Sequence, residues 1–435
     1  MPPASVKAIS WVAASSASVS RPQVIVPRAI RETRKPLRPR YRCSTRRSLR
    51  GDRHSGGLWR ALVKGESGDT RPPGLAEGVT DRYGPRVRLG LNLGYWGAGN
   101  DAANLELAKE ADRLGFSVVW AAEAYGSDAP TVLAWVAAQT ERVDVGSAIL
   151  QIPARTPAMA AMTAATLDTL SGGRFRMGLG VSGPQVSEGW HGVRFDKPLA
   201  RTREYVDIVR SALRRERLRY DGEHYTLPLP DGPGKALTLT VHPVREHIPV
   251  YLAAVGPKNV ELAGEIADGW LAIFFSPEHS AGSMAALRAG REKAGKTLDG
   301  FDVVPTVPMH VGEDWRSCAD HVRPYAALYV GGMGSRQKNF YNDLAVRMGF
   351  AAEAAEVQDK YLSRDYAGAQ AALPVEFLDS TSLLGPKERI ADRMRAYAEA
   401  GVTTLTISPM LQDLEQGIAA LRTATEALDL AGVGS

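Results

Sequence analysis

Residues 143–192 have the sequence VDVGSAILQIPARTPAMAAMTAATLDTLSGGRFRMGLGVSGPQVSEGWHG, which contains two β/α units in succession. A β-branched run at 143–151 precedes an Ala-rich helical stretch at 157–170, and a second apolar run follows at 174–182. Short strands that alternate with helices of this length are typical of a parallel α/β sheet. The same alternation extends from this segment in both directions along the chain.

Apolar runs that predict strands occur eight times from Arg86 onward. They lie at 86–94, 117–123, 143–151, 174–182, 248–255, 269–276, within 301–311 and at 403–410, with amphipathic helical stretches between them. A doubly wound sheet usually has fewer strands and carries a dinucleotide signature at its first turn. The count therefore predicts an α/β fold, a closed (β/α)8 TIM barrel.

Two insertions interrupt this alternation of strands and helices. After the fourth strand, residues 217–241 alternate around Asp221-Gly222, which predicts a β-hairpin followed by another extended segment. After the seventh strand, residues 330–380 are helical with a Gly-rich start. This second insertion would lie over the C-terminal ends of the strands, either as a lid or as a packing appendage.

Charge is distributed unevenly over the 435 residues. Residues 1–85 contain 17 Lys and Arg against 6 Asp and Glu, whereas residues 86–435 contain 36 against 42. The first part lacks apolar periodicity, so we expect a disordered Arg/Pro-rich extension ahead of one barrel domain at 86–435. A transit peptide and a nucleic-acid-binding arm are less favoured interpretations of the same composition. We expect neither a nucleic-acid partner nor a membrane span, because the apolar stretch at 9–19 is short and interrupted by serines.

Cysteine usage and missing motifs exclude several classes of protein. Cys43 and Cys318 cannot build a disulfide framework, and no CxxC or Cys/His cluster suggests a metal site. These features indicate a reduced, cytoplasmic protein. The sequence has no GxSxG, HExxH or P-loop lysine motif, which argues against hydrolases and nucleoside-triphosphatases.

The glycine loop GLGVSG at 178–183 matches the GxGxxG pattern of dinucleotide-binding sites. However, it follows the fourth strand, Pro184 and Gly189 predict no immediate helix, and no acidic strand end follows about 20 residues later to bind a ribose. We interpret it as a loop at a barrel strand end that lets a flat ring or a phosphate approach the backbone. Relief of crowding alone is the alternative.

A second loop of small residues, Ala253 to Gly256, follows the fifth strand. Pro257 suits the first turn of a helix, whose amides would be free to bind an anion, and Lys258 adds positive charge. Two such loops on consecutive strands predict one elongated, phosphate-bearing ligand at the mouth of the barrel.

Polar side chains that are candidates for catalysis or ligand binding lie near the same strand ends. Glu123 closes the second strand and would orient a substrate, transfer a proton, or form an ion pair or helix cap. Arg155 lies where an acidic ligand tail would be met. His191 is a catalytic candidate with a structural alternative. Asp128 is expected only to cap a helix.

The chain resembles the F420-dependent branch of the luciferase-like oxidoreductases, which includes methylenetetrahydromethanopterin reductases and glucose-6-phosphate dehydrogenases. The resemblance covers almost all of 86–430. The segments that carry it are 89–97, 118–130, 143–192, 198–210 and 249–270.

This resemblance implies a cofactor site at the C-terminal mouth of the barrel. A cis non-prolyl peptide that backs the deazaflavin ring of coenzyme F420 would lie at Ala148-Ile149. The ring, ribityl chain and phosphate would contact the fourth-strand loop (Gly180, Val181, Ser182, Gly183 and Pro184) and the fifth-strand loop (Ala253, Ala254, Val255 and Gly256). The family's acidic residue after the second strand matches Glu123.

Two departures from the family leave the substrate open. Several members have a histidine where this chain has Ala124, and the glutamate of the glucose-6-phosphate enzymes is not recognisable in VSGPQ at 181–185. The resemblance implies hydride transfer between C5 of F420 and a small organic substrate, and it also implies a homodimer. The alternative is a monooxygenase that uses FMN and molecular oxygen. A non-enzymatic ligand-binding barrel is a third hypothesis.

Overall fold

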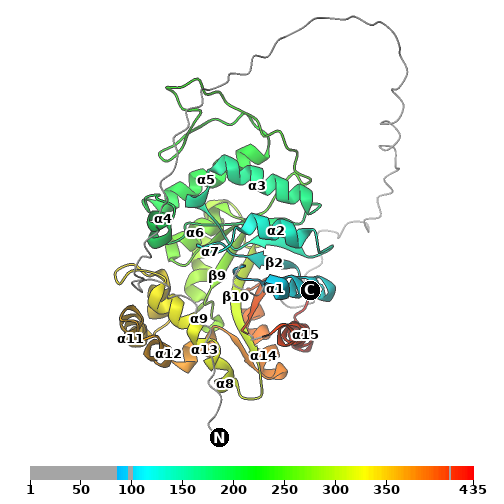
Figure 1. Cartoon of the computed structure of the whole chain (residues 1–435), viewed down its shortest axis with the longest axis vertical. Coiled ribbons are helices and arrows are strands. Elements are labelled where there is room, and N and C mark those ends of the chain that lie inside the picture. The colour runs from blue at the N-terminus through cyan, green and yellow to red at the C-terminus, as the bar shows by residue number, and fades with distance from the viewer. Residues whose placement is uncertain (1–85, 97–100, 411–412) are drawn as a thin grey trace, which may run out of the picture. The chain divides into compact units, whose positions relative to one another are not determined.

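Eight parallel strands close into a barrel in the computed structural model, which describes residues 86–96, 101–410 and 413–435. The strands follow one another around the barrel, each hydrogen-bonded to the next, and β12 pairs with β1 to complete the ring (Figure 1). In this order they are β1 (Arg88–Asn92), β2 (Val118–Ala121), β3 (Asp144–Ser147), β5 (Phe175–Gly180), β8 (Val250–Ala253), β9 (Gly269–Ile273), β10 (Asp302–Val311) and β12 (Thr404–Pro409). The prediction of a (β/α)8 barrel is confirmed.

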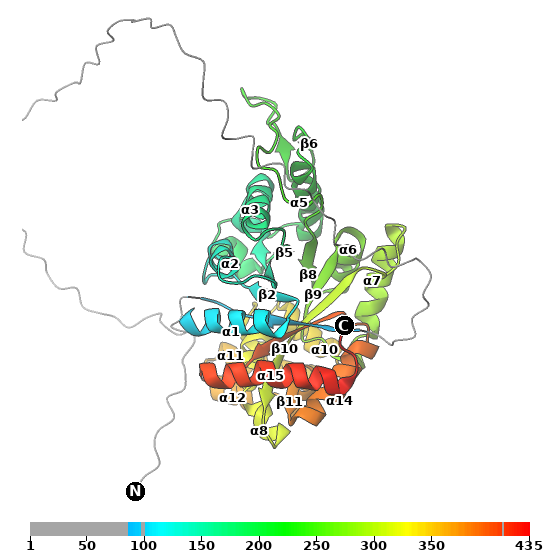
Figure 2. The ribbon, with the colours of Figure 1, turned by 90° about the vertical axis from the view of Figure 1, so that its right-hand side faces the viewer.

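Helices cover the outside of this barrel. They are α1 (Asp101–Leu114), α2 (Ala129–Ala137), α3 (Pro157–Leu170), α5 (Pro198–Leu213), α6 (Pro257–Ile266), α7 (Ala281–Lys293), α14 (Lys387–Glu399) and α15 (Leu414–Ala431). Proline occupies the first turn of α2, α3, α5 and α6, where its missing N–H costs nothing. The first and last helices, α1 and α15, lie side by side (Figure 2).

Side chains alternate between two environments along each strand. One set packs outward against the helices and forms the largest core cluster. The other set points into the barrel, where Val118, Trp120, Tyr251, Leu271 and Val304 form a separate cluster. At the N-terminal end of the strands this interior becomes charged and contains a buried Asp302.

The insertion after β5 carries the hairpin that was predicted, with β6 (Tyr220–Asp221) antiparallel to β7 (Thr226–Leu227). The expectation of no helix directly after the glycine loop was wrong, because α4 (Pro184–Gly189) begins there. Pro184 takes a first-turn position, and Gly189 is the last residue of the helix, so neither residue interrupts a helical hydrogen-bond ladder.

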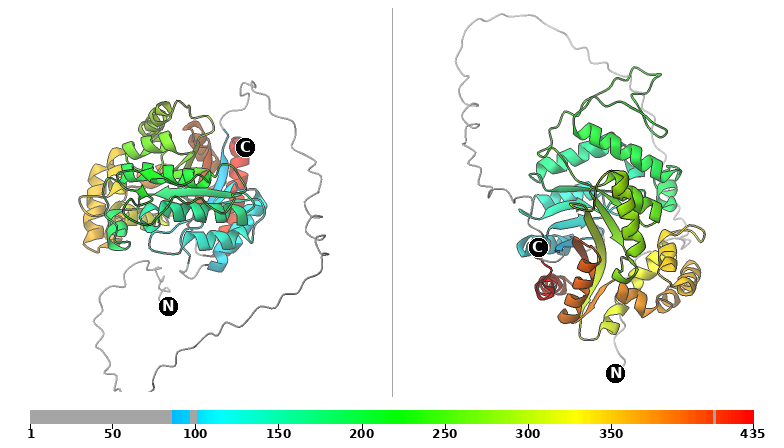
Figure 3. Two further views of the ribbon diagram at one scale, coloured as in Figure 1. Left: turned by 90° about the horizontal axis from the view of Figure 1, so that it is seen from above. Right: turned by 180° about the vertical axis from the view of Figure 1, so that it is seen from behind.

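The insertion after β10 is helical and begins earlier than the sequence predicted, at Trp315. It comprises α8 (Trp315–Asp320), α9 (Arg323–Ala327), a π-helical turn η3 (Leu328–Gly332), α10 (Phe340–Arg347), α11 (Ala351–Leu362), α12 (Tyr366–Ala371) and α13 (Val375–Ser380). These helices have a core of their own and gather on one side of the barrel (Figures 1 and 3). They lead into β11 (Leu383–Gly385), an additional strand that pairs with β10.

Short elements complete the connections: β4 (Leu150–Gln151) and the 3-10 turns η1 (Ile152–Ala154) and η2 (Pro277–His279). The extension expected at residues 1–85 lies outside the described residues. Within the described ranges, no helix combines the length and the apolar composition that crossing a bilayer requires. The same residues hold no group of three or more His, Cys, Asp and Glu side chains placed to bind a metal ion.

Candidate active site at the barrel mouth

The loops predicted to bind the cofactor meet at the C-terminal ends of β3, β5 and β8. A Cβ atom placed on Gly180 would lie 2.9 Å from Cδ1 of Ile149 and 3.6 Å from Cβ of Ala253. The peptide bond between Ala148 and Ile149 is cis, as the resemblance implied. Three loops that are distant in sequence therefore form one surface. Because Gly180 has no side chain, a ligand can come close to the backbone of this surface.

A hydrogen-bonded pair fixes the relative positions of β3 and β5 just below this surface. The Ser147 hydroxyl donates to the carbonyl of Gly178 at 2.8 Å and accepts from the amide of Gly178 at 2.9 Å. A Cβ atom on Gly178 would lie only 1.9 Å from the Ser147 carbonyl oxygen. The first glycine of GLGVSG is therefore required for close contact between two strands, and the second for the open surface above them.

The remaining loop residues differ in what they offer to a ligand. Gly183 and Gly256 are the N-cap residues of α4 and α6, and neither helix has a side-chain cap on its first amides. Ser182 has a positive φ of 60°. Ala254 packs into the outer core, and its carbonyl accepts a hydrogen bond from the Trp270 indole. The side chain and the carbonyl oxygen of Ala254 are therefore both engaged in the outer core.

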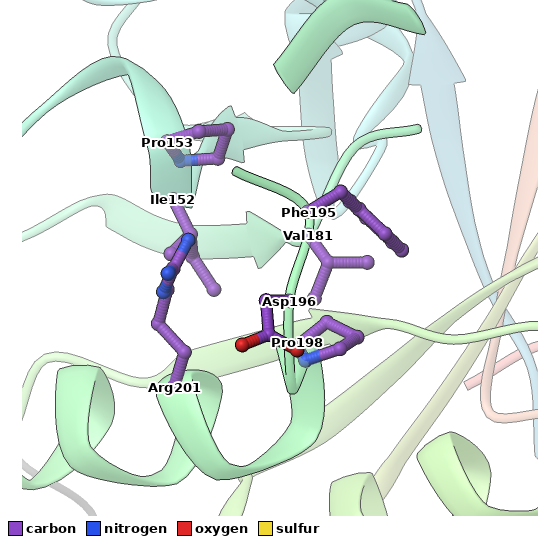
Figure 4. Close-up of a pocket in the computed structure, with 7 residues that line it drawn as sticks. All are labelled: Ile152, Pro153, Val181, Phe195, Asp196, Pro198 and Arg201. Atoms are coloured by element: carbon purple, nitrogen blue, oxygen red, sulfur yellow. The ribbon is translucent and has the colours of Figure 1, made fainter. Parts of the chain in front are cut away.

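Val181 lines a small hollow of about 10 Å³ beside this surface, together with Ile152, Pro153, Phe195, Asp196, Pro198 and Arg201 (Figure 4). A space of this size holds about one water molecule. This hollow is therefore too small to hold a substrate.

Glu123 forms an ion pair, which is one of the alternatives that the sequence left open. Its carboxylate accepts hydrogen bonds from both terminal nitrogens of Arg155, at 2.8 and 2.9 Å, and from the backbone amide of Gln151 at 3.0 Å. The residue is 7% exposed. Asp128 caps α2, as predicted, and also pairs with Arg155 at 3.2 Å.

His191 joins the same network through Gln151. The Nε2 atom of His191 lies 2.7 Å from Oε1 of Gln151, whose amide nitrogen donates to the carbonyl of Ala124 at 2.6 Å. The two predicted catalytic side chains, Glu123 and His191, are thus connected by one buried glutamine. These hydrogen bonds hold the loop after β2, the end of β3 and the loop after β5 together.

Strained backbone occurs at the same end of the barrel. Ala124 (φ 44°), Ser182 (φ 60°) and Phe274 (φ 49°) follow β2, β5 and β9, and all three are non-glycine residues in the left-handed region. Such conformations cost of the order of 1 kcal/mol each and are concentrated at functional sites. Lys197, Arg215 and Arg364, which flank helices, also have positive φ, so half of the strained non-glycine residues of the described chain lie at strand ends near the mouth.

The sequence reasoning missed an aromatic cluster contributed by the insertion after β10. Tyr329 lies 4.8 Å from Tyr325 and 4.9 Å from Tyr341 between ring centroids, and Phe274 packs against all three rings. A weak signal exists in the sequence, since Tyr325 and Tyr329 are four residues apart and precede the Gly331-Gly332 pair. Trp96, which follows β1, is partly buried and packs against the outer core.

Two buried polar atoms inside the barrel lack a hydrogen-bond partner among the described residues. These are the indole nitrogen of Trp120 and the hydroxyl of Thr406. Both lie on inward-facing strand positions under the mouth. Both residues are fully buried in the packed barrel interior, below the surface formed by the loops. The surface of small residues and the uncapped first turn of α6 are what fit a planar group that carries an anionic tail.

The sequence also matches known proteins over nearly the whole barrel. The family model "Luciferase-like monooxygenase" matches residues 93–404. A Mycobacterium tuberculosis protein named as a coenzyme F420-dependent oxidoreductase is 43% identical over 342 residues, which cover 77% of this chain and 99% of that protein.

The chain belongs to the luciferase-like family. A second luciferase-like relative, the 5,10-methylenetetrahydromethanopterin reductase of Archaeoglobus fulgidus, is 28% identical and covers 71% of this chain and 90% of its own length. The solved structure of the coenzyme F420-dependent tetrahydromethanopterin reductase from Methanopyrus kandleri superposes with a TM-score of 0.65 at 24% identity, covering 77% of this chain and 97% of that one. That superposition supports the barrel fold.

Proposed function

We propose that this luciferase-like enzyme is a coenzyme F420-dependent oxidoreductase that acts on a small organic substrate. The convergence of Ile149, Gly180 and Ala253 at one surface carries the proposal, and the 43% identical relative named for F420 supports it. When bound, the deazaflavin would exchange a hydride at C5 with the substrate. The protein would contribute orientation, exclusion of water and proton handling.

Each predicted site residue receives a role in this proposal. Ala148 and Ile149 would lie behind the ring, and Gly180, Val181, Ser182, Gly183 and Pro184 would line its edge and the ribityl chain. The loop of Ala253, Ala254, Val255 and Gly256 leads into α6, whose uncapped first turn suits a phosphate. Glu123 and His191 would act as positioning residues, because their partners Arg155 and Gln151 hold them in place.

Cofactor titration tests this function. We expect the purified full chain to bind F420, measured from the fluorescence of the deazaflavin, and to prefer it over FMN. Gly180→Val should weaken F420 binding at least tenfold, because the added methyl groups fall between Ile149 and Ala253. Gly282→Val, at an α7 position where a Cβ atom meets nothing within 4 Å, is the matched control. Tight FMN binding without F420 binding would contradict the F420 assignment and favour the FMN-dependent alternative.

We further propose that the enzyme is a cytoplasmic homodimer that needs no nucleic acid. Large apolar side chains are exposed on two adjacent helices: Trp135 on α2, 54% exposed, and Met159, Met162 and Leu170 on α3. Several large apolar side chains exposed on neighbouring helices favour a protein interface there. Sedimentation should give a dimer for the full chain and a monomer for the Trp135→Glu, Met162→Glu double variant. A monomeric parent chain would contradict the proposal.

A further inference from the structure

The strands β1 and β12 carry polar side chains on their inward-facing positions where they reach the mouth. On β12, Leu405 and Ile407 belong to the outer core, so Thr406 and Ser408 face the barrel interior. Asn92, the last residue of β1, faces the interior for the same reason, because the residues on both sides of it belong to the outer core. Two neighbouring strand ends thus present an amide and a hydroxyl to the mouth.

One hydrogen bond joins these two strand ends. Nδ2 of Asn92 donates to Oγ of Ser408 at 3.4 Å, while Oδ1 of Asn92 accepts from the backbone amide of Gly94 at 3.1 Å. The contact with Gly94 fixes which way the amide group of Asn92 faces. The second N–H of Asn92 and the hydroxyl hydrogen of Ser408 have no acceptor among the described residues. Two hydrogen-bond donors therefore remain available to a ligand.

Thr306 adds a third donor deeper in the barrel. It lies on β10 two residues after Val304, which belongs to the interior cluster, and it is in register with Thr406 on β12. Its hydroxyl has no partner within the part of the chain that the structure describes. Thr406 is completely buried, whereas Asn92, Thr306 and Ser408 are partly exposed although the residue before each of them is buried. Solvent therefore reaches these three side chains, here called the polar wall, inside the barrel.

The strand order places the polar wall opposite the proposed cofactor surface. Around the ring of eight strands, the fourth strand after β3 is β10, the fourth after β5 is β12, and the fourth after β8 is β1. In a closed eight-stranded barrel, strands separated by half of the ring lie across the axis from each other. The polar wall therefore faces the surface of Ile149, Gly180 and Ala253, and a substrate that lies on that surface would contact the wall.

The polar wall contains donors without charge. In the described strands β1, β10 and β12, the inward positions from Gly90, Val304 and Thr406 to the strand ends carry no Lys, Arg, Asp or Glu. His310, near the end of β10, directs Nδ1 to the carbonyl of Met410 at 2.8 Å, and burial lowers its pKa. An ionised group that enters a barrel without an opposite charge loses hydration that nothing replaces, whereas a neutral oxygen needs only donors.

We propose that Asn92, Thr306 and Ser408 form the substrate-binding side of the mouth and select an uncharged compound with an oxygen that accepts hydrogen bonds, against phosphate esters and carboxylates. This inference rests on the proposed F420-dependent function, which supplies the opposite surface. Asn92 and Ser408 are adjacent, so both donate to the lone pairs of one substrate oxygen. Thr306 donates to a second polar group of the substrate or to a water molecule beneath it.

Titration with matched probes tests the polar wall without turnover. The probes are cyclohexanone, cyclohexyl phosphate and cyclohexanecarboxylate, added to the full chain saturated with oxidised F420, which has no hydride to give to the ketone. Calorimetry or saturation-transfer NMR gives each dissociation constant. We expect cyclohexanone to bind about tenfold more tightly than either anion, or better, because only the anions require a positive charge.

Three variants each remove one donor. Asn92→Asp keeps the acceptor for the Gly94 amide, and Thr306→Val and Ser408→Ala remove hydroxyls with little change in shape. Each should weaken cyclohexanone binding about fivefold to tenfold, the effect of one lost hydrogen bond, while F420 affinity stays within about twofold of the parent value. Thr406→Val is the matched control, because it removes a buried hydroxyl in register with Thr306 and should leave cyclohexanone binding unchanged.

A gain of binding complements these losses. Ser408→Lys places a positive charge on the polar wall and should make cyclohexyl phosphate bind more tightly than cyclohexanone. Damage to the fold cannot produce this reversal. If Asn92→Asp, Thr306→Val or Ser408→Ala melts well below the parent chain, the decision passes to Ser408→Lys, in which an unchanged preference would contradict the proposal.

The outcomes separate the polar wall from the cofactor assignment. If the parent chain binds F420 but cyclohexanone affinity is the same in all three donor variants, the polar wall is overturned and the F420 function stands. The same holds if the F420-bound parent chain fails to bind cyclohexanone or binds cyclohexyl phosphate equally well. If the parent chain binds no F420, the proposed function itself is overturned.

Discussion

Arg155 holds the carboxylate of Glu123 through both terminal nitrogens, in an environment from which water is largely excluded. The side chains are 14% and 8% exposed. Removing one member of a buried ion pair leaves the other charged and unpaired, which typically costs 3–5 kcal/mol. The same pair fixes Gln151 and, through it, His191.

We predict that Glu123→Gln and Arg155→Gln each lower the free energy of unfolding by about 3 kcal/mol. The double variant should lose little more than either single variant, because the second substitution relieves an unpaired charge. Denaturant unfolding of the four proteins gives the coupling energy. Fully additive losses would show that Glu123 and Arg155 contribute independently.

Glu278 provides a residue-scale test in acid. Burial opposes its ionisation, but hydrogen bonds from Arg393 and Ser276 outweigh burial and lower the pKa to about 2, from an ordinary 4.5. A lowered folded-state pKa contributes stability above pH 4.5 that disappears as the pH falls through 2. Glu278→Gln should therefore cost about 1 kcal/mol at pH 7 and nothing below pH 2. Thermal melts of both proteins from pH 7 to 2 would reveal any difference that persists in acid.

At the scale of an element, β5 carries two glycines with different tasks. A methyl group on Gly178 meets the carbonyl oxygen of Ser147 at 1.9 Å, whereas one on Gly180 meets the flexible end of Ile149 at 2.9 Å and Ala253 at an ordinary contact distance. We predict that Gly178→Ala lowers the free energy of unfolding by about 3 kcal/mol or more, while Gly180→Ala changes it by less than about 1 kcal/mol. Gly180→Ala should instead weaken F420 binding. Melting temperatures and F420 titrations distinguish the two, and equal destabilisation would argue against this division.

At the scale of the whole molecule, one carboxylate connects several barrel strands near their N-terminal ends through hydrogen bonds. Asp302 on β10 accepts hydrogen bonds from Arg88 on β1, Arg176 on β5, Tyr251 on β8 and Thr404 on β12. We predict that Asp302→Ala lowers the free energy of unfolding by about 3–5 kcal/mol without changing F420 affinity in the folded fraction. Calorimetry and titration at low temperature provide the two measurements. Selective loss of F420 binding would place Asp302 in the site instead.

The described barrel is complete within residues 86–435, which have a mildly acidic composition. We predict that a chain beginning at Arg86 keeps the melting temperature and F420 affinity of the full protein. Loss of either property would show that residues 1–85 take part in folding or binding.

The sequence alone predicted most of the barrel, because strand and helix periodicity are local properties. It also predicted the glycine loops, since missing side chains at strand ends are visible in a sequence. It could not decide between the roles of Glu123, because the partner Arg155 is 32 residues away and only the closed barrel brings the two together. The same limit explains why the aromatic cluster was missed, since Phe274 and Tyr325 are 51 residues apart in the chain.

The proposed cofactor surface comes from residues 148–256, whereas the aromatic half of the mouth is contributed mainly by the insertion that begins at Trp315. The two parts of the mouth are therefore supplied by separate segments of the chain. Exchange of the segment between β10 and β11 would alter the aromatic side of the mouth and leave the proposed cofactor surface in place. Enzyme engineers can make the same exchange, because the cut points lie at two strands that are already paired with each other.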